Sequence, residues 1–158
     1  MKDSKVFLSL GSNLGDRKKN LLRCIEYLRS ISKIKKISSI YETKPFKVEI
    51  KQDDFLNLVV EIVYKNSPYD LLENISIIEK KLGRVRSEKK NEPREIDIDI
   101  LFFDDLVLDE KKLILPHPRF SERLFVLDPL NEIASEFKDP LTKKRIKDLL
   151  IDAQNSSN

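Results

Sequence analysis

The sequence predicts an α+β protein with a ferredoxin-like βαββαβ core, in which helices cover one face of a mainly antiparallel sheet, plus a C-terminal extension. Two observations support this fold class. The spacing of the apolar residues changes between the strand period and the helix period in the order strand, helix, strand, strand, helix, strand. The 158 residues are also enough for one core, so we expect a single domain over 1–158. In such a fold the second face of the sheet is left for ligands.

The first half of the core is expected to hold three strands and one helix. The residues from Gly11 to Asp16 have turn chemistry, and Asp16 is a good N-cap for the helix that follows it. The alternation between 34 and 41 is imperfect but favours a strand. The expected elements are strand 6–10, helix 17–31, strand 34–41 and strand 55–64.

The strand over 55–64 has two chemically different faces. One face is uniformly apolar and should pack on the core. The other face begins with Phe55 and Asn57, where a planar ligand could be stacked and hydrogen-bonded. From the residues alone, Phe55 is more simply explained as a core aromatic, and Asn57 as an edge-strand amide. The apolar face consists of Leu56, Leu58, Val60, Ile62 and Tyr64.

The second half of the chain starts with a helix whose ends are marked. Ser67 is the expected cap, Pro68 lies in the first turn and Gly83 ends the helix. Pro116 and Pro118 make a rigid segment around His117, which from sequence alone would be a capping or buried histidine. The remaining expected elements are a strand from 93 to 103, its hairpin partner at 106–108, a helical turn running into an extended piece over 119–127, a last helix over 143–151, and a frayed polar tail from 153.

Asp97 and Asp99 dominate the strand that follows the second helix. Isoleucines at 96, 98 and 100 alternate with acids, so the isoleucines should face the core and the two aspartates should share the other face. Two readings are equally open. The segment is an ordinary amphipathic strand with its polar face in water, or it is a Mg²⁺-type site in which carboxylates hold the ion and phosphate completes its shell.

Basic residues directly before the aspartates favour the second reading. The segment 79–94 contains seven basic residues against three acidic ones, and Arg94 lies beside the pair. A basic segment next to two carboxylates is typical of a site for a metal-bound polyphosphate.

Composition excludes several classes of protein. Hydrophobic residues make up 40% and charged residues 36%, and no long apolar run is present, so we expect a soluble protein with no membrane contact. The single cysteine, Cys24, rules out an internal disulfide and favours a reducing cytoplasm. Its place among apolar helix positions predicts burial rather than nucleophilic chemistry. The net charge of +3 says little about partners.

Six segments together resemble one known family. Taken in order from about residue 5 to residue 135, they are similar to 6-hydroxymethyl-7,8-dihydropterin pyrophosphokinase of folate biosynthesis. The segments are Ser9–Arg17, Tyr41–Pro45, Asp54–Asn57, Gly83–Arg86, Pro93–Asp99 and Pro116–Arg119.

The resemblance implies transfer of the β,γ-diphosphate of ATP to the hydroxymethyl oxygen of the pterin, with AMP leaving. It implies two Mg²⁺ ions on Asp97 and Asp99. By the same resemblance, the other ATP-site residues are Arg84 and Arg94 on the transferred phosphates, His117 and Arg123 holding ATP, and the backbone near Ile100 and Ile114 at the adenine.

The resemblance also implies a pterin site. The pterin would lie between Phe55 and Phe125, with Asn57 reading its amide-like edge and Asp97 close to it as well as to the metal. The backbone around Thr43, Lys44 and Phe46 would complete the pocket. The implied partners are small molecules only, for a monomer that binds no nucleic acid.

The chain departs from the family pattern before the acidic strand. Glu92 stands where a small residue, often Gly, is usual, and Lys90–Asn91 replaces an Arg-Trp pair found in some members. These departures concern a loop expected to close over ATP and leave the metal site intact. The alternative function is a ferredoxin-like nucleic-acid-binding module with sheet-face aromatics and a basic loop. A non-catalytic pterin-binding relative is a third possibility, against which the intact acids, arginines and histidine argue.

Overall fold

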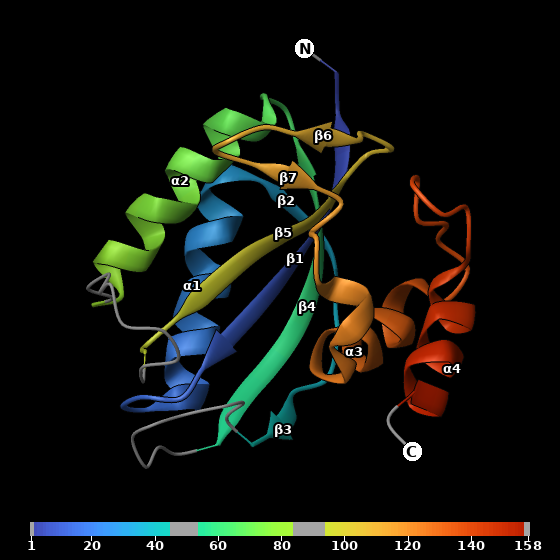
Figure 1. Cartoon of the computed structure of the whole chain (residues 1–158). Coiled ribbons are helices and arrows are strands. Elements are labelled where there is room, and N and C mark those ends of the chain that lie inside the picture. The colour runs from blue at the N-terminus through green and yellow to red at the C-terminus, as the bar shows by residue number, and fades with distance from the viewer. Residues whose placement is uncertain (1, 45–53, 84–93, 157–158) are drawn as a thin grey trace.

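The computed structural model describes residues 2–44, 54–83 and 94–156, and it is built around one antiparallel sheet of five strands (Figure 1). The strands run side by side in the order β2-β4-β1-β5, and β3 also pairs with β4. This order, with α1 and α2 in the connections, is the ferredoxin-like arrangement, so the predicted fold class is confirmed. The strands are β1 Ser4–Ser12, β2 Lys33–Ile37, β3 Tyr41–Thr43, β4 Phe55–Tyr64 and β5 Asp97–Phe103.

Helices α1 (Arg17–Ile31) and α2 (Pro68–Lys81) lie together on one face of the sheet (Figure 1). The predicted caps are confirmed. The Asp16 carboxylate accepts a hydrogen bond from the Lys19 N–H, and the Ser67 hydroxyl accepts one from the Asp70 N–H. Gly83 follows α2 with φ +96°, a conformation that glycine adopts without steric cost.

The first hydrophobic core fills the space between these helices and the sheet. The apolar face predicted for β4 packs here, with Leu56 partly buried at the margin. Ile96, Ile98 and Ile100 are each no more than 5% exposed and belong to the same core, which confirms the alternation read from the sequence. Cys24 of α1 is fully buried among them, as expected.

A second hydrophobic core lies on the opposite face of the sheet, where the C-terminal helices pack (Figure 1). Phe7 and Val59 face it from the central strands. The register of β1 and β5 shifts after Phe7, and the consecutive Leu101 and Phe102 both contribute to this core, as a β-bulge permits. The second face is therefore only partly open to ligands. The elements covering it are the 3₁₀ turn η1 Phe120–Glu122, α3 Leu124–Ala134 and α4 Ile146–Ser156.

Helix α3 corrects the sequence-based expectation for 119–127. The helical turn is present as η1, but the residues after it form a regular helix instead of an extended piece. Pro129 lies inside α3, where a proline usually ends a helix. Burial of Val126, Leu127 and Leu130 in the second core outweighs that local signal.

The strand predicted over 34–41 is also wrong in its extent, because the structure divides it into β2 and β3. Ser38 lies between β2 and β3 and hydrogen-bonds to Val59 of β4 through both its backbone and its side chain. The Ser38 N–H donates to the Val59 carbonyl, and the Ser38 hydroxyl accepts from the Val59 N–H, both at 2.9 Å.

Two further expectations near the C-terminus are corrected. The segment 106–108 does not pair with β5. Instead β6 (Leu108–Asp109) pairs with β7 (Ile114–Leu115) in a separate hairpin, and Asp104–Asp105 form the turn that leads away from the sheet. The tail expected to fray from 153 is helical to Ser156, because Ala153 continues the stripe of Ile146, Leu149 and Leu150 onto the second core.

Among the described residues, none of the helices has both the length and the apolar character needed to span a bilayer.

Candidate active site

A row of three residues crosses the end of the sheet where β1 finishes. Gly11 of β1 pairs with Asn57 of β4 on one side and with Asp97 of β5 on the other. A Cβ atom on Gly11 would lie 3.0 Å from Asn57 Oδ1 and 3.5 Å from a ring carbon of Phe55. Because Gly11 has no side chain, its backbone forms an open floor between the Asn57 amide, the Phe55 ring and the Asp97 carboxylate. Gly11 and Ser12 belong to β1, not to the turn predicted from 11 onward, because β4 continues the pairing to Leu56.

Asp97 and Asp99 lie on the face of β5 opposite the buried isoleucines, and both are half-buried. Between them, the Ile98 N–H donates at 3.0 Å to the carboxylate of Glu79, which is only 2% exposed on α2. This contact fixes the start of β5 from the side of the helices. In the described part of the chain, no group of three or more His, Cys, Asp and Glu side chains could hold a metal. The aspartates are a two-carboxylate set, which suits Mg²⁺ because that ion needs few protein ligands.

Arg94 lies between the acid and the aromatic ring. Its Nη1 is 2.9 Å from Asp97 Oδ2, and its guanidinium carbon is 5.9 Å from the centroid of Phe55. Its backbone is held by Asn13, whose N–H donates to the Arg94 carbonyl at 3.1 Å while Asn13 Oδ1 accepts from the Arg94 N–H at 2.9 Å.

The aromatic and amide pair predicted on β4 comes together with β3. Thr43 pairs with Phe55, and Thr43 Oγ1 accepts a hydrogen bond of 2.7 Å from Asn57 Nδ2. Asn57 is 4% exposed, whereas Phe55 is half-buried. Phe55 belongs to neither hydrophobic core, which disfavours the reading as a core aromatic. Lys44 follows Thr43 and is exposed.

His117 is held with a defined tautomer. Its backbone N–H donates to the Leu101 carbonyl at 3.0 Å, and its ring Nδ1 accepts from the Arg119 backbone N–H at 3.2 Å. Burial first, and then the positive charge of Arg123, lower the pKa of His117 from 6.5 to about 4, while the charge of Asp97 acts in the opposite direction. At neutral pH the ring is therefore uncharged, and its proton lies on Nε2 as a hydrogen-bond donor.

Arg123 and Phe125 lie at the start of α3. The Arg123 guanidinium carbon is 5.6 Å from the centroid of the Phe125 ring, and Phe125 packs partly against the second core. Of the residues assigned to adenine contacts, Ile100 has its side chain in the first core, so only its backbone can meet a ligand. Ile114 is exposed on β7. Two predicted site residues, Arg84 and Phe46, lie outside the described residues, as do Arg86 and Glu92.

Sequence reasoning missed four residues that support this site, which are Gly11, Asn13, Arg17 and Glu79. Gly11, Asn13 and Arg17 did carry a signal, since all three fall within the motif 9–17, but the first two were assigned only to a turn and Arg17 only to the start of a helix. For Glu79, no local pattern marks the contact, because its partner Ile98 lies on another element. Arg17 Nη1 donates to Glu42 Oε2 at 2.8 Å and to the Asp54 carbonyl at 2.6 Å, on either side of the segment 43–53.

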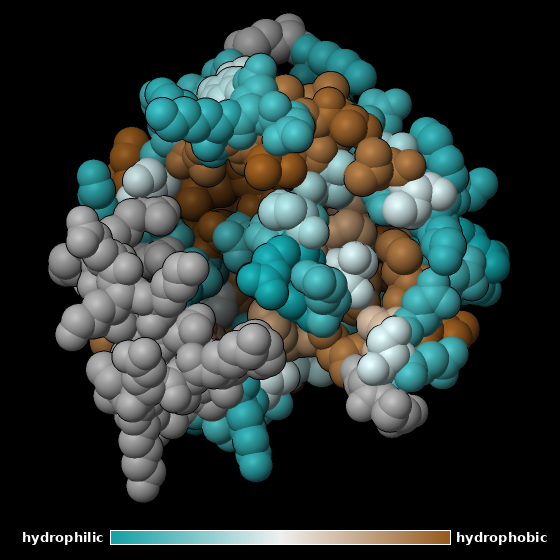
Figure 2. Space-filling view, viewed as in Figure 1, coloured by the Kyte–Doolittle hydropathy of each residue, from teal (hydrophilic) through white to brown (hydrophobic). Residues whose placement is uncertain are grey.

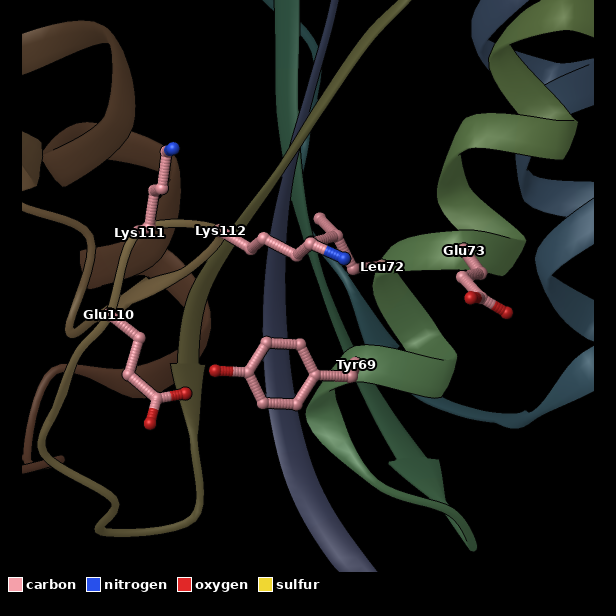
Figure 3. A pocket seen from close by; sticks show the side chains of 6 residues that line it. All are labelled: Tyr69, Leu72, Glu73, Glu110, Lys111 and Lys112. Atoms are coloured by element: carbon pink, nitrogen blue, oxygen red, sulfur yellow. The ribbon is translucent and has the colours of Figure 1, made fainter.

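A pocket of about 420 Å³ lies elsewhere, between α2 and the β6–β7 turn (Figure 3). None of the residues described above lines it. Its charged side chains are two carboxylates and two ammonium groups, which balance each other. The surface over the β6–β7 hairpin is partly apolar around a hollow (Figure 2), and Leu106, Val107 and Ile114 are exposed in this region of the chain. The lining residues are Tyr69, Leu72, Glu73, Glu110, Lys111 and Lys112.

The ferredoxin-like sheet and the acids, arginine and aromatic–amide pair on its open end define an α+β enzyme that handles phosphate groups. Residues 7–135 match the model of the family described as 7,8-dihydro-6-hydroxymethylpterin-pyrophosphokinase (HPPK). The chain belongs to this family.

Relatives of known name agree with the family match. The chain is 44% identical over 139 residues to 2-amino-4-hydroxy-6-hydroxymethyldihydropteridine pyrophosphokinase of Bacillus subtilis, covering 87% of this chain and 82% of that one. It is 42% identical over 143 residues to the protein of the same name from Aquifex aeolicus, covering 90% of this chain and 88% of the relative.

Solved structures support the fold. A crystal structure of Plasmodium falciparum HPPK-DHPS superposes on 98% of this chain with a TM-score of 0.76 at 18% sequence identity. The chain spans 44% of that protein, and at this identity the likeness concerns the fold alone.

Proposed function

We propose that this chain transfers the diphosphate group of ATP to the hydroxymethyl oxygen of 6-hydroxymethyl-7,8-dihydropterin in folate biosynthesis, releasing AMP and the pterin diphosphate. One observation carries the proposal beyond the family match. In the row Asn57–Gly11–Asp97, a hydrogen-bonding amide and a carboxylate lie on either side of the open floor at Gly11. Arg94 pairs with the Asp97 carboxylate and also lies over the Phe55 ring. Two chemically different ligand regions, one for a flat polar heterocycle and one for phosphates, meet at Asp97.

The pterin side of the site is formed by β3, β4 and α3. Phe55 offers a half-buried ring for stacking, and we place Phe125 on the other side of the heterocycle. The hydrogen bond to Thr43 holds the Asn57 amide in one orientation, so that the amide can recognise a ring edge without further ordering. We assign the backbone of Thr43, Lys44 and Phe46 to the rim of this pocket, and Asp97 to its inner end.

Asp97 and Asp99 would hold Mg²⁺, and we propose two ions as in the family implied by the sequence. The fit rests on two carboxylates on one face of one strand, which match the hard-oxygen preference of the ion. When bound, the ions supply neutralisation of the triphosphate charge and orientation of the attacking hydroxyl. Arg94 already balances part of the charge of Asp97 before ATP arrives.

The phosphate side is formed by cations and a neutral donor. We assign Arg84 and Arg94 to the transferred phosphates, because guanidinium forks match phosphate oxygens in two-point contacts. His117 presents an Nε2–H donor without adding charge, and Arg123 lies near enough to affect its titration. Both are assigned to ATP, and the backbone at Ile100 and Ile114 to the adenine.

We further infer a cytoplasmic monomer whose partners are these small molecules. The alternative of a nucleic-acid-binding module has no support from the family match. Asp97 and Asp99 also argue against it, because two carboxylates on the ligand face repel a phosphate backbone unless metal ions intervene.

The test is incubation of the purified chain with ATP, Mg²⁺ and 6-hydroxymethyl-7,8-dihydropterin, followed by separation of the nucleotides. AMP should form in a 1:1 ratio with pterin diphosphate. Formation of ADP, or of no product, would refute the proposal. Asp97→Asn and Asp99→Asn keep the shape of each side chain but remove its charge, and each should abolish AMP release with an unchanged circular dichroism spectrum. Normal turnover by either variant would remove the metal assignment.

A further inference from the structure

Glu132 of α3 makes a concentrated set of hydrogen bonds to the edge of the sheet. Its Oε1 accepts from the Tyr41 hydroxyl at 2.7 Å. Both of its carboxylate oxygens accept from the Ser39 N–H, at 3.1 and 3.0 Å, and Oε2 also accepts from the Ser39 hydroxyl at 3.1 Å. The carboxylate thus holds the chain just before β3 and the first residue of β3 itself.

The titration behaviour of the pair agrees with this geometry. The hydrogen bond to Glu132 raises the pKa of Tyr41 to about 12, and the Tyr41 hydroxyl lowers the pKa of Glu132. A second contact lies beside it, since Lys36 Nζ of β2 donates to the Ile133 carbonyl at 3.2 Å near the C-terminal end of α3. A cation at that end also interacts favourably with the helix dipole. Helix α3 is therefore attached to β2 and β3 at two neighbouring points.

The two residues joined by this contact, Glu132 and Tyr41, lie on the same elements as residues that the proposed function assigns to the pterin pocket. Phe125 precedes Glu132 by seven residues, and two helical turns place both on the same side of α3, about 10 Å apart along the axis. Thr43 follows Tyr41 by two residues, so both share one face of β3 at a separation of roughly 7 Å. The helix side that reaches Tyr41 therefore also carries Phe125, and the strand face that reaches Glu132 also carries Thr43, the partner of Asn57.

We propose that Glu132 is a positioning residue that sets the separation between the two sides of the pterin pocket, with Phe125 on one side and Thr43 and Asn57 on the other. The proposal rests on the proposed function. Glu132 touches neither the pterin nor the phosphates in this assignment; it acts through Tyr41 and Ser39. A planar ligand stacked between two rings is sensitive to their spacing, because dispersion contacts weaken steeply with small gaps. A loss of these hydrogen bonds should therefore weaken pterin binding and leave the ATP side intact.

A purely stabilising role makes a different prediction. Glu132 is exposed, and hydrogen bonds and charge pairs at exposed sites contribute little to the free energy of unfolding. If the contact only tied α3 to the sheet, its removal would lower the melting temperature and affect the KM values for both substrates alike. A selective rise in the KM for the pterin separates positioning from general stabilisation.

The experiment compares AMP release by the full chain and four variants. Tyr41→Phe removes one hydroxyl and keeps the ring, and Glu132→Ala removes every contact of the carboxylate. Glu132→Gln keeps an acceptor oxygen and should recover part of the loss. The matched control is Glu26→Ala, which removes an exposed glutamate of α1 that pairs only with the nearby Arg29 among the interactions described. KM for pterin and for ATP and kcat are measured for each, with melting temperatures.

We expect the KM for the pterin to rise about fivefold in Tyr41→Phe, as loss of one hydrogen bond implies, and further in Glu132→Ala. The KM for ATP should stay within about twofold, and the control should match the unmodified chain in both. If the unmodified chain releases AMP but neither variant changes the pterin KM, or both KM values rise together, the inference is wrong while the proposed function stands. If the unmodified chain itself releases no AMP, the proposed function fails and the inference fails with it. Should Glu132→Ala not fold, the nearly isosteric Tyr41→Phe decides.

Discussion

At the scale of single residues, the proposed site depends on the small size of Gly11 and on the fixed protonation of His117. Gly11 contributes no side chain, and the open floor between Asn57 and Asp97 exists for that reason. His117 contributes a neutral ring whose donor atom is determined by a backbone N–H. The placement of Asp97 and Asp99 on one face of β5 could be predicted from sequence, because acids alternate with isoleucines. The contact of Glu79 with Ile98 could not, because it depends on a helix that folding brings alongside β5, and Gly11 was assigned only to a turn.

Gly11→Ala tests the open floor. A Cβ at 3.0 Å from Asn57 Oδ1 is closer than most real contacts, so the amide must shift by a few tenths of an ångström, whereas the Phe55 ring carbon at 3.5 Å would be in ordinary contact. We expect the KM for the pterin to rise by about tenfold or more and the KM for ATP to change little, measured by AMP release. Ser4→Ala at the opposite end of β1 is the control for a change in the strand itself. Equal pterin KM values for Gly11→Ala and the unmodified chain would mean that the floor is not used.

His117 predicts a pH dependence of stability. Its pKa is lowered to about 4 in the folded chain from an ordinary value of 6.5, so between these values the unfolded chain binds a proton that the folded chain excludes. The contribution of His117 is therefore complete above pH 6.5 and is lost as the pH falls towards 4. Thermal melts without Mg²⁺ or ATP should show a smaller fall in melting temperature over this range for His117→Asn than for the unmodified chain. Parallel curves for the two proteins would exclude the lowered pKa.

At the scale of elements, local signals predicted caps and periodic stripes correctly and failed where tertiary contacts decide. Helix α1 begins and ends where expected, because Asp16 caps it and its apolar stripe is regular. The division into β2 and β3 was not foreseen, since it depends on Ser38 binding to Val59. Helix α3 was missed because Pro129 contradicts a helix locally, while burial against the second core supports one.

Arg17 binds both the end of β3 and the residue before β4. A cation in the first turn of a helix opposes the helix dipole, so its contacts with Glu42 and the Asp54 carbonyl must offset that cost. We expect Arg17→Ala to raise the KM for the pterin several-fold, because Thr43 and Phe55 lie next to the two contact points. The free energy of unfolding should fall by only about 1 kcal/mol or less, since the pair is partly exposed.

The control for this prediction is Arg29→Ala, which removes an exposed arginine from the other end of the same helix. It should leave both the pterin KM and the stability nearly unchanged. A pterin KM that does not distinguish the two arginine variants would show that Arg17 has no part in shaping the pocket.

At the scale of the whole molecule, the sheet separates two hydrophobic cores that share the same strands. The first core could be predicted, because the alternation in β4 and β5 and the stripes of α1 and α2 all point to one face. The second core could be anticipated only as an extension, since its helices are short and one contains a proline. The proposed site lies at the end of the second face that the C-terminal helices leave uncovered, so in this proposal α3 is both a core element and the helix that carries Phe125.

Leu149→Ala tests whether the two cores unfold together. Leu149 of α4 is 7% exposed in the second core, and loss of its buried methyl groups should lower the free energy of unfolding by about 2–4 kcal/mol. Because β1, β4 and β5 contribute to both cores, denaturant unfolding should remain a single transition with coincident near- and far-ultraviolet circular dichroism. Ile151→Ala is the matched control, since Ile151 lies on the same helix at 53% exposure and should change stability by less than about 0.5 kcal/mol. Separate transitions in Leu149→Ala would mean that the C-terminal helices form an independent unit rather than part of one cooperative domain.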